Sequence, residues 1–556
     1  MKSRYLFNRV STLLIFLFGC SSFYSLALQA QESDDYYRGI ARGLELFGEV
    51  YREVLERYVG QIDPALLAER GINGMLSQLD PYSAYLSPNS DYRRSTVRVG
   101  IGVEVETRNG LVTIVDIYDG YSAAGSGLRI GDHILAVDNV PIPAASIDSF
   151  YHQLKGERGT YVRLSVMREG AAKLLQFDLE RERIRIPNVS FAGIVDSGIV
   201  YIKLDRFGDN AGNEFRGELL RLTRHERSLE DIRGVIVDLR NNSGGILEEV
   251  IEVSNALLPK DDLIVTTDGR DSVEREVWVT ERDPVAPGLP LVILVNKGTA
   301  SASEILAGAV QDNDRGIIVG EPTLGKGLVQ SVQHLPFDAS LRLTTAWYVT
   351  PSGRSIQRLD LLLPDIRSII PDSLEGVFTT RNGRIVRGGE GIHPDTLTPQ
   401  FPEGSLLSRL DRGGIFFTFA SRYSAQFDSL PTKFYVDAKM LETFEEAAFD
   451  ELVVYESRQG VLALLDSLKR SSQIPASSKL QALWDEIHTE FLANEREALV
   501  QERDQIRDYL EREIKKKFSN SSVRVRLDLE GDLQYQTARN LLLNSRLYNS
   551  FLKPLK

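Results

Sequence analysis

The chain has 556 residues, of which 42% are hydrophobic and 26% charged, with a formal net charge of −13 at pH 7. This length predicts roughly three to four domains of about 150 residues each. The negative charge argues against a nucleic-acid partner, because such proteins present basic grooves or stripes. Cys20 is the single cysteine and the six histidines are widely spaced, so we expect neither a disulfide framework nor a bound metal.

The N-terminus has the pattern of an export signal. Basic residues precede the apolar run Leu13 to Phe18, and small residues follow at Ala27 and Ala30. We therefore predict a signal peptide over residues 1–30 and a periplasmic or otherwise extracytoplasmic location. A weaker alternative takes Leu17-Phe18-Gly19-Cys20 as a lipoprotein box, which would associate the protein with a membrane through a lipid on Cys20.

Residues 31–92 predict a helical segment without chemistry of its own. Apolar residues from Leu44 to Tyr58 recur at three- and four-residue steps, which places them on one helix face. Asp63-Pro64 then opens a second helix, and two predicted turns close the segment, Asp80-Pro81-Tyr82-Ser83 and Ser87-Pro88-Asn89. We interpret the segment as a helical cap on the domain that follows.

Residues 93–183 change to short β segments between Gly, Asp and Pro turns, with one amphipathic helix near residues 147–154. The first strand opens with Gly100-Ile101-Gly102-Val103, and closely spaced glycines let backbone N–H groups converge on a carboxylate. Together with AAGSGLRIGDHILAVDNVPI, this segment resembles a PDZ domain. The resemblance implies that Gly100, Ile101, Gly102 and Val103 bind the C-terminus of a peptide. A tight turn without a ligand is the plainer alternative.

From residue 184 the chain alternates strands and helices. Short continuous apolar runs such as YIKLD, GVIVDLR, LVILVN and GIIVG predict buried strands, and helical patterns lie between them. We therefore expect a multidomain α/β protein, with a largely parallel sheet in a core over residues 184–402. Residues 403–556 predict a mainly helical region. Its charged stretch from Glu495 to Lys517 is interpreted as a solvated helix with a sparse apolar stripe.

Three mechanisms compete for the α/β domain. A Ser-His-Asp hydrolase is unsupported, because no G-x-S-x-G pentapeptide occurs. Residues Gly320 to Lys326 fit the phosphate loop G-x-x-x-x-G-K, but Gly327 stands where Ser or Thr should bind Mg²⁺, and an apolar strand follows instead of a helix. A serine/lysine hydrolase remains. Lysine can act as a general base only if burial lowers its pKa from about 10.4 toward neutrality.

Several motifs carry a family resemblance in the right order. GTASASEILAGAVQDNDRGIIVGEPTLGKGLVQ, DLRNNSGG and TPSGRSIQ look like the carboxyl-terminal processing, or tail-specific, proteases. The resemblance spans about residues 36–402 and implies a crotonase- or ClpP-like α/β core with an inserted PDZ domain. It also implies that Ser301 is the nucleophile, that Lys326, 25 positions later, is the base, and that Gln330 is the third member.

The implied roles have physical counterparts. Ala302 N–H and a backbone N–H of Gly244 or Gly245 would form the oxyanion hole. Gln330 would orient Lys326, which requires a bend because four strand residues span about 13 Å. Ser301-Ala-Ser-Glu304 also fits a helix capping box, so the plain alternative makes Ser301, or Ser303, a helix cap.

The sequence thus predicts an exported serine endopeptidase that needs no cofactor. It would bind protein substrates with apolar or unstructured C-terminal tails through the PDZ domain and cleave near the tail with Ser301 and Lys326. By the resemblance, an occupied PDZ groove would also favour the active arrangement. The alternative is a non-catalytic PDZ scaffold on an inactive protease fold. Self-association, an adaptor protein and the role of residues 403–556 stay open.

Overall fold

A computed structural model of the chain describes residues 36–87, 97–143, 146–226, 229–270, 275–362, 376–402, 404–459, 463 and 478–554. The predicted signal peptide and Cys20 lie outside the described residues. None of the helices in the described ranges has the length and apolarity needed to cross a membrane. The chain divides into two compact units, one of residues 1–90 with 331–343 and one of residues 91–330 with 344–556.

The described part of the first unit contains a helix over residues 36–57, α2 (Pro64–Leu76) and β1 (Ala84–Leu86). Asp63 caps α2 as predicted, because its carboxylate accepts from Ala65 N at 2.8 Å. The predicted turn at Asp80 to Ser83 is confirmed, because the Asp80 carboxylate accepts from Tyr82 N and Ser83 N, both at 2.8 Å. The strand β1, for which no element was predicted, follows this turn. It pairs antiparallel with residues 340–342 of β18 (Ser340–Val349), a distant partner that the local sequence does not reveal.

The second unit begins with a small β domain over residues 97–185. Its main sheet has the order β3-β4-β5-β7-β8 with β6 on β5, while β2 pairs with β9. Phe150 and Leu154 of the single helix α3 are buried in the core of this domain. The bounds are β2 Val97–Gly100, β3 Val103–Arg108, β4 Leu111–Ile117, β5 His133–Val137, β6 Val140–Pro141, α3 Ile147–Leu154, β7 Tyr161–Met167, β8 Leu175–Glu180 and β9 Glu182–Arg185.

A six-stranded sheet of order β10-β11-β12-β15-β16-β21 forms the centre of the α/β core. β10 is antiparallel to β11, and the remaining neighbours are parallel, as predicted for the apolar runs. The bounds are β10 Val189–Val195, β11 Ile199–Leu204, β12 Gly234–Asp238, β15 Leu291–Val295, β16 Ile317–Gly320 and β21 Thr396–Leu397.

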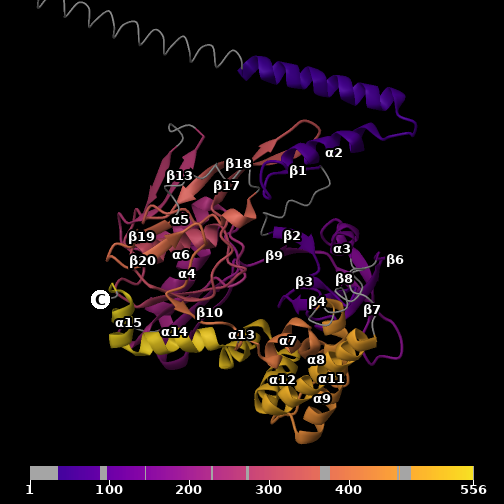
Figure 1. Cartoon of the computed structure of the whole chain (residues 1–556). Helices are drawn as coiled ribbons and strands as arrows, with labels where there is room; N and C mark the ends of the chain where they lie inside the picture. The colour runs from indigo at the N-terminus through magenta and orange to yellow at the C-terminus, as the bar shows by residue number, and fades with distance from the viewer. Residues whose placement is uncertain are drawn as a thin grey trace, which may run out of the picture. The chain divides into compact units, whose positions relative to one another are not determined.

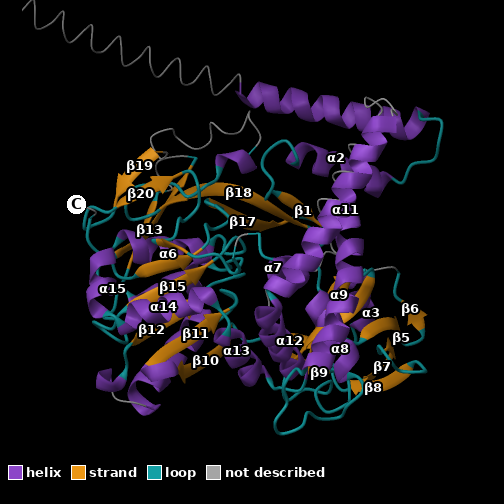
Figure 2. Cartoon of the chain, turned by 60° about the horizontal axis from the view of Figure 1, so that its bottom comes forward, coloured by secondary structure: helices purple, strands orange, loops and turns teal. Residues whose placement is uncertain are grey.

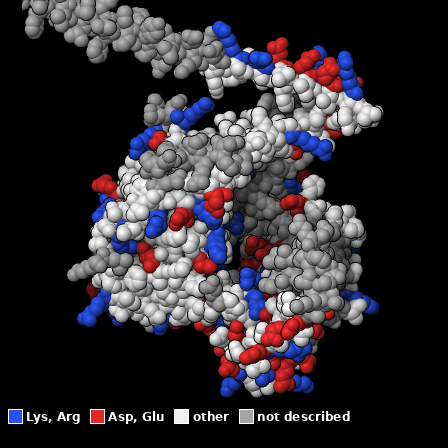
Figure 3. Space-filling model, in the orientation of Figure 1, with Lys and Arg blue, Asp and Glu red and all other residues white. Residues whose placement is uncertain are grey.

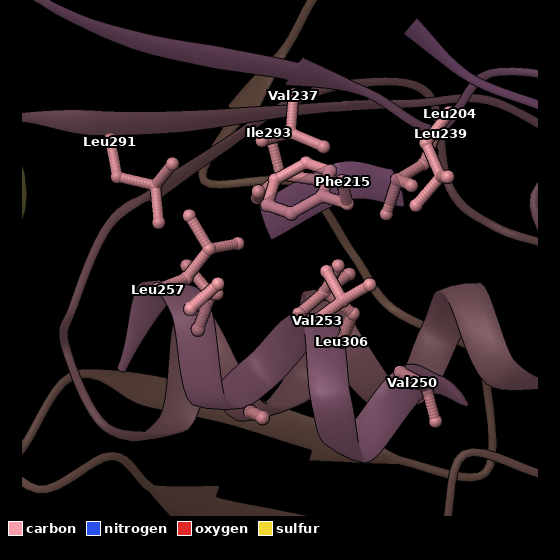
Figure 4. Packing of buried hydrophobic residues seen from close by; sticks show 14 of the residues in the cluster. Leu204, Phe215, Val237, Leu239, Val250, Val253, Leu257, Leu291, Ile293 and Leu306 are labelled. Atoms are coloured by element: carbon pink, nitrogen blue, oxygen red, sulfur yellow. The ribbon is translucent and has the colours of Figure 1, made fainter. Parts of the chain in front are cut away.

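One face of this sheet is covered by α4 (Ala211–Leu220), α5 (Leu247–Leu257) and α6 (Ala302–Asp312). Figure 4 shows strand residues such as Val237 and Ile293 pointing toward Val253 and Leu306 of the helices. All four side chains are fully buried. The apolar periodicity of the helices and the continuous apolar runs of the strands therefore meet in one core.

The opposite face is covered from the far end of the sequence. Side chains of α13 (Ser521–Glu530), α14 (Leu533–Leu543) and α15 (Ser545–Phe551) cluster with residues of β11, β12, β15 and β16. Figure 2 draws α14 and α15 beside β12 and β15, and Figure 1 shows α13 and α14 next to β10. The predicted core boundary at residue 402 therefore separates segments that share one hydrophobic cluster.

A second sheet in this unit joins β18 to β13 and β13 to β14 in antiparallel register, and β17 also pairs with β18. β19 and β20 form a two-stranded antiparallel hairpin. The bounds are β13 Leu263–Gly269, β14 Glu276–Val279, β17 Leu328–His334, β19 Gly376–Thr379 and β20 Ile385–Gly388. The antiparallel pairing of β18 agrees with its alternating apolar and polar sequence.

A helical module consists of α7 (Leu406–Arg412), α8 (Ile415–Ser424), α9 (Ala438–Gln459), α11 (Ser478–Gln501) and α12 (Arg503–Lys517). The predicted apolar stripe of the charged stretch is buried in its core, with Ile506, Leu510 and Ile514 at 0% exposure. On the face in Figure 3, acidic side chains gather at the lower end of the molecule, interspersed with basic ones.

The small β domain contacts two helix ends of the C-terminal region. Arg129 donates to the carbonyls of Ser424 and Phe427 at 3.1 and 2.8 Å, where α8 ends. Asp119 accepts from the hydroxyl of Ser521 at 2.7 Å, where α13 begins. A cation at a helix C-terminus and an anion at an N-terminus both complement the helix dipole and satisfy unpaired backbone groups. These contacts fix the β domain to α8 and α13.

Candidate active site

Ser301 lies in the turn between β15 and α6 and has a strained backbone. Its φ and ψ are 57° and −120°, a region that residues with a side chain rarely occupy. Strain of this kind persists where the surrounding structure holds it, and it clusters at functional sites. The Asn242 carbonyl holds the turn by accepting from Ala300 N at 3.0 Å and from the Ser303 hydroxyl at 3.0 Å.

The carboxylate of Glu304 joins this turn to the loop that carries the lysine. One of its oxygens accepts from Ser301 N and Lys326 N, both at 2.8 Å. The other oxygen accepts from the Thr323 hydroxyl at 2.5 Å and Gly325 N at 2.7 Å. The backbone nitrogens of the predicted nucleophile and base therefore lie no farther apart than two hydrogen bonds.

Glu304 is fully buried. Burial raises the pKa of this carboxyl above its ordinary value of 4.5, although the four hydrogen bonds favour the charged form and oppose that rise. Our sequence interpretation gave Glu304 only the part of a capping-box residue. The back-bond to Ser301 N is present, but the same carboxylate also organises the lysine loop, which a local motif could not indicate.

Ser303 is not the helix cap, because it lies inside α6, where its hydroxyl donates to the Asn242 carbonyl. Ser301 occupies the N-cap position of α6, and its carbonyl accepts from Glu304 N at 2.8 Å. The cap and nucleophile interpretations of Ser301 are therefore compatible.

The loop Gly325-Lys326-Gly327 is held at every backbone polar group. It is followed by strand β17, as expected for this sequence and unlike a phosphate-binding loop, which opens a helix. The three N–H groups donate to side chains, those of Gly325 and Lys326 to Glu304 and that of Gly327 to Gln357. The three carbonyls accept, from Arg358 N at Gly325, from the Tyr348 hydroxyl at Lys326 and from Tyr348 N at Gly327. A base on such a loop has a preorganised backbone.

Gln330 lies on β17, four residues beyond Lys326. Its amide nitrogen donates to the Leu328 carbonyl at 3.1 Å and lies 3.4 Å from the Thr344 hydroxyl. These contacts orient Gln330 along its own sheet. Its predicted action on Lys326 stays a prediction.

The glycine loop of DLRNNSGG packs directly against the serine turn. A Cβ on Gly244 would lie 2.8 Å from Ala302 N, and one on Gly245 would lie 2.1 Å from the Phe207 carbonyl oxygen. Gly244 N already donates to the Asn242 side chain at 2.9 Å. Within the described residues, Gly245 N and Ala302 N have no hydrogen-bond acceptor. Both amides are therefore candidates for the predicted oxyanion hole.

Asp238 and Arg240 of the same motif form a buried ion pair at 2.6 Å, and Tyr201 donates to Asp238 at 2.5 Å. Burial alone would raise the pKa of Asp238, but the adjacent guanidinium outweighs it and leaves that pKa below its ordinary value. Arg240 also pairs with Asp532 at 2.6 Å. The pair therefore ties the end of β12 to α14, a role that the motif did not disclose.

The predicted carboxylate loop connects β2 to β3. Gly102 has a φ of 84°, and a Cβ there would lie 2.5 Å from Tyr121 Cβ. Tyr118 N and Ala123 N donate to the carbonyls of Gly102 and Ile101. Within the described residues, the amides of Ile101 and Gly102 have no acceptor, whereas Gly100 and Val103 are strand residues. No group of three or more His, Cys, Asp or Glu in the described ranges could hold a metal ion.

Comparisons with known proteins agree with this arrangement. Four families match in chain order, namely an activating protease CtpB N-terminal domain at residues 22–90, a PDZ domain at 99–179, peptidase family S41 at 198–368 and a probable PDZ-protease C-terminal helical domain at 406–542. The fold is therefore that of an S41 peptidase core with a PDZ domain and helical segments at both ends, and the chain is a serine-type peptidase.

Named relatives indicate which kind of serine-type peptidase the chain resembles. A carboxy-terminal-processing protease of Bartonella bacilliformis is 33% identical over 390 residues, which cover 68% of this chain and 88% of that protein. A carboxyl-terminal-processing protease of a Synechocystis species is 35% identical over 53% of this chain and 69% of its own length. The chain belongs to the carboxy-terminal processing protease family. A solved photosystem II D1 C-terminal processing protease is 26% identical over 63% of this chain and 85% of that chain, with a TM-score of 0.37.

Proposed function

We propose that this protein is an exported endopeptidase that binds the C-terminal tails of protein substrates and cleaves near them with a Ser301/Lys326 dyad. The observation that carries the proposal is the single Glu304 oxygen that accepts from both Ser301 N and Lys326 N. It links the strained serine turn to the lysine loop without any other residue between them.

In this mechanism the neutral Lys326 amine takes the proton of the Ser301 hydroxyl as its oxygen attacks the scissile carbonyl. The oxyanion is stabilised by Ala302 N–H and Gly245 N–H. Gly245 is preferred to Gly244 because the Gly244 amide is already bonded to Asn242. The lysine ammonium then gives its proton to the leaving amine, and water hydrolyses the acyl-enzyme with Lys326 again as base. No cofactor takes part.

The PDZ domain supplies the tail site. The adjacent amides of Ile101 and Gly102, which have no acceptor in the part of the chain that the structure describes, suit a terminal carboxylate. Both residues belong to the loop at the start of β3, beside which a bound tail would extend as an added strand. An apolar or unstructured tail fits this mode, and the names of the relatives agree with it. Occupancy of the groove would favour the active arrangement of the core.

Export rests on the sequence of residues 1–30, whose basic start, apolar run and small residues are typical of a signal peptide. A periplasmic location follows from this proposal. A lipid on Cys20 is the less favoured variant. Membrane fractionation of wild type and Cys20→Ser separates the two possibilities. If a lipid on Cys20 anchors the protein, the substitution would release it from the membrane fraction.

The decisive experiment compares wild type, Ser301→Ala and Lys326→Ala on a peptide with a free apolar C-terminus and on its C-terminal amide. We expect cleavage only by wild type, with the free acid preferred. Equal cleavage by all three would rule out the dyad. Tail binding with no cleavage by wild type would favour the alternative, a PDZ scaffold on an inactive protease fold.

A further inference from the structure

We propose that Gln357, in the TPSGRSIQ motif, is a positioning residue for the general base and fixes the backbone of the Lys326 loop through its buried side-chain amide. This inference rests on the proposed role of Lys326. It assigns to Gln357 part of the orienting task that the family resemblance gives to Gln330.

The contacts of Gln357 occupy both ends of its amide. Its oxygen accepts from Gly327 N at 2.9 Å, and its nitrogen donates to the Arg358 carbonyl at 2.9 Å. The side chain is 0% exposed. Hydrogen bonds at both ends hold this buried amide in one orientation. Its oxygen can therefore fix the position of the Gly327 backbone.

The segment around Gln357 also touches the loop through its backbone. Arg358 N donates to the Gly325 carbonyl at 2.9 Å. A Cβ on Gly327 would lie 2.7 Å from Gln357 N, so glycine is needed for the close approach. Gly325 and Gly327 are thus both attached to residues 357–358, and Lys326 lies between the two attachments.

Glu304 and Gln357 together accept from all three backbone amides of the Gly325-Lys326-Gly327 loop. Glu304 accepts from Gly325 N and Lys326 N, and Gln357 accepts from the next amide, Gly327 N. The two acceptors differ in charge. A second carboxylate at position 357 would favour the ammonium form of a neighbouring lysine, so less of the lysine would be present as the neutral amine near neutral pH. A neutral amide supplies the acceptor without that cost.

The test uses Gln357→Glu and Gln357→Leu in the full chain. Gln534→Leu is the matched control, because Gln534 is also 0% exposed, accepts from Arg240 at 3.0 Å and donates to the Thr398 carbonyl at 2.8 Å. The measurements are kcat and KM for the tail peptide from pH 6 to 10, and the thermal unfolding midpoint of each variant.

Gln357→Glu should move the rising limb of kcat/KM upward by about one pH unit or more. Gln357→Leu should lower kcat by about tenfold or more, with KM within about twofold of wild type. Gln534→Leu should lower the unfolding midpoint but leave the pH profile in place.

An unshifted profile in Gln357→Glu, or activity losses that merely follow thermal stability in all three variants, would overturn the inference. Activity in Lys326→Ala would instead overturn the proposed function. A dead Lys326→Ala variant beside an unchanged Gln357→Glu profile would remove only the role of Gln357.

Discussion

The backbone amide of Lys326 donates to the carboxylate of Glu304 at 2.8 Å. The same oxygen accepts from Ser301 N, so the two loops of the site are aligned by one buried side chain. This carboxylate is the most direct target for separating the geometry of the site from the chemistry of the proposed Ser301/Lys326 dyad.

Glu304→Gln should lower peptide cleavage at least about tenfold. An amide has a single acceptor oxygen. In one orientation Gly325 N would face the NH₂ group, and in the other Ser301 N and Lys326 N would both face it. A buried donor without an acceptor costs about 1–3 kcal/mol. Steady-state kinetics and the rate of Ser301 labelling by a fluorophosphonate would report the loss. Unchanged labelling would contradict a positioning role for Glu304.

We also expect the stability difference between wild type and Glu304→Gln to depend on pH. Because the folded pKa of Glu304 is raised above 4.5, its contribution to stability is fully present below pH 4.5 and is lost as the pH rises through the folded pKa. Glu304→Gln has no such slope. Thermal unfolding from pH 4.5 to 8 should therefore show the variant gaining on wild type as the pH rises. A constant difference between the two proteins would refute this.

Gly245→Ala should remove most activity by displacing the loop that we propose to stabilise the oxyanion. Its Cβ would lie 2.1 Å from the Phe207 carbonyl oxygen, and loss of one oxyanion donor lowers kcat about 10²–10³-fold. Gly217→Ala is the control, since a Cβ there meets nothing within 4 Å in helix α4. It should keep activity and gain up to about 1 kcal/mol of stability. Equal kcat in both variants would exclude Gly245.

Gly102→Ala should abolish tail binding while sparing the catalytic core. The added methyl would collide with Tyr121 Cβ, and the φ of 84° disfavours a side chain. Fluorescence anisotropy with a labelled tail peptide, beside its C-terminal amide, measures the effect. Gly110→Ala has a similar φ of 74° and no neighbour within 4 Å, so it controls for backbone strain. Intact binding in Gly102→Ala would place the carboxylate elsewhere.

Arg129→Ala should loosen the PDZ domain from helix α8. Arg129 supplies hydrogen bonds to two carbonyls at the helix end, and charged contacts of this kind contribute about 1–3 kcal/mol. Limited proteolysis and hydrogen exchange of residues 415–428 should reveal the change. Arg163→Ala offers a comparison in the same domain, because its pair with Asp178 is half exposed and solvent screening leaves such pairs little effect on stability. Equal protection in the two variants would contradict a fixed contact.

The sequence predicted the fold where local pattern and burial coincide. The continuous apolar runs became the parallel strands β11, β12, β15 and β16, because each is buried on both faces. The strand β1 escaped prediction because its partner lies in β18, far along the chain. A three-residue strand carries too little periodicity of its own to be recognised.

The site residues were likewise predicted where a local motif marks them and missed where only distant contacts do. Ser301 and Lys326 were marked by a string of motif residues, whereas Glu304 looked like a helix cap and Gln357 like one letter of a motif. Their importance depends on which backbone amides surround them after folding. Only the three-dimensional structure brings Gly325, Lys326 and Gly327 to those two acceptors.

Tyr535, Leu541 and Tyr548 close one face of the central sheet, although the strands that they cover end hundreds of residues earlier in synthesis. While the chain is still on the ribosome, that face stays open to solvent or chaperones. The sheet whose strand ends carry Asp238 and lead to Ser301 therefore becomes complete only with the last helices. Folding of the core must therefore await the synthesis of α14 and α15, because their side chains complete one of its two apolar faces.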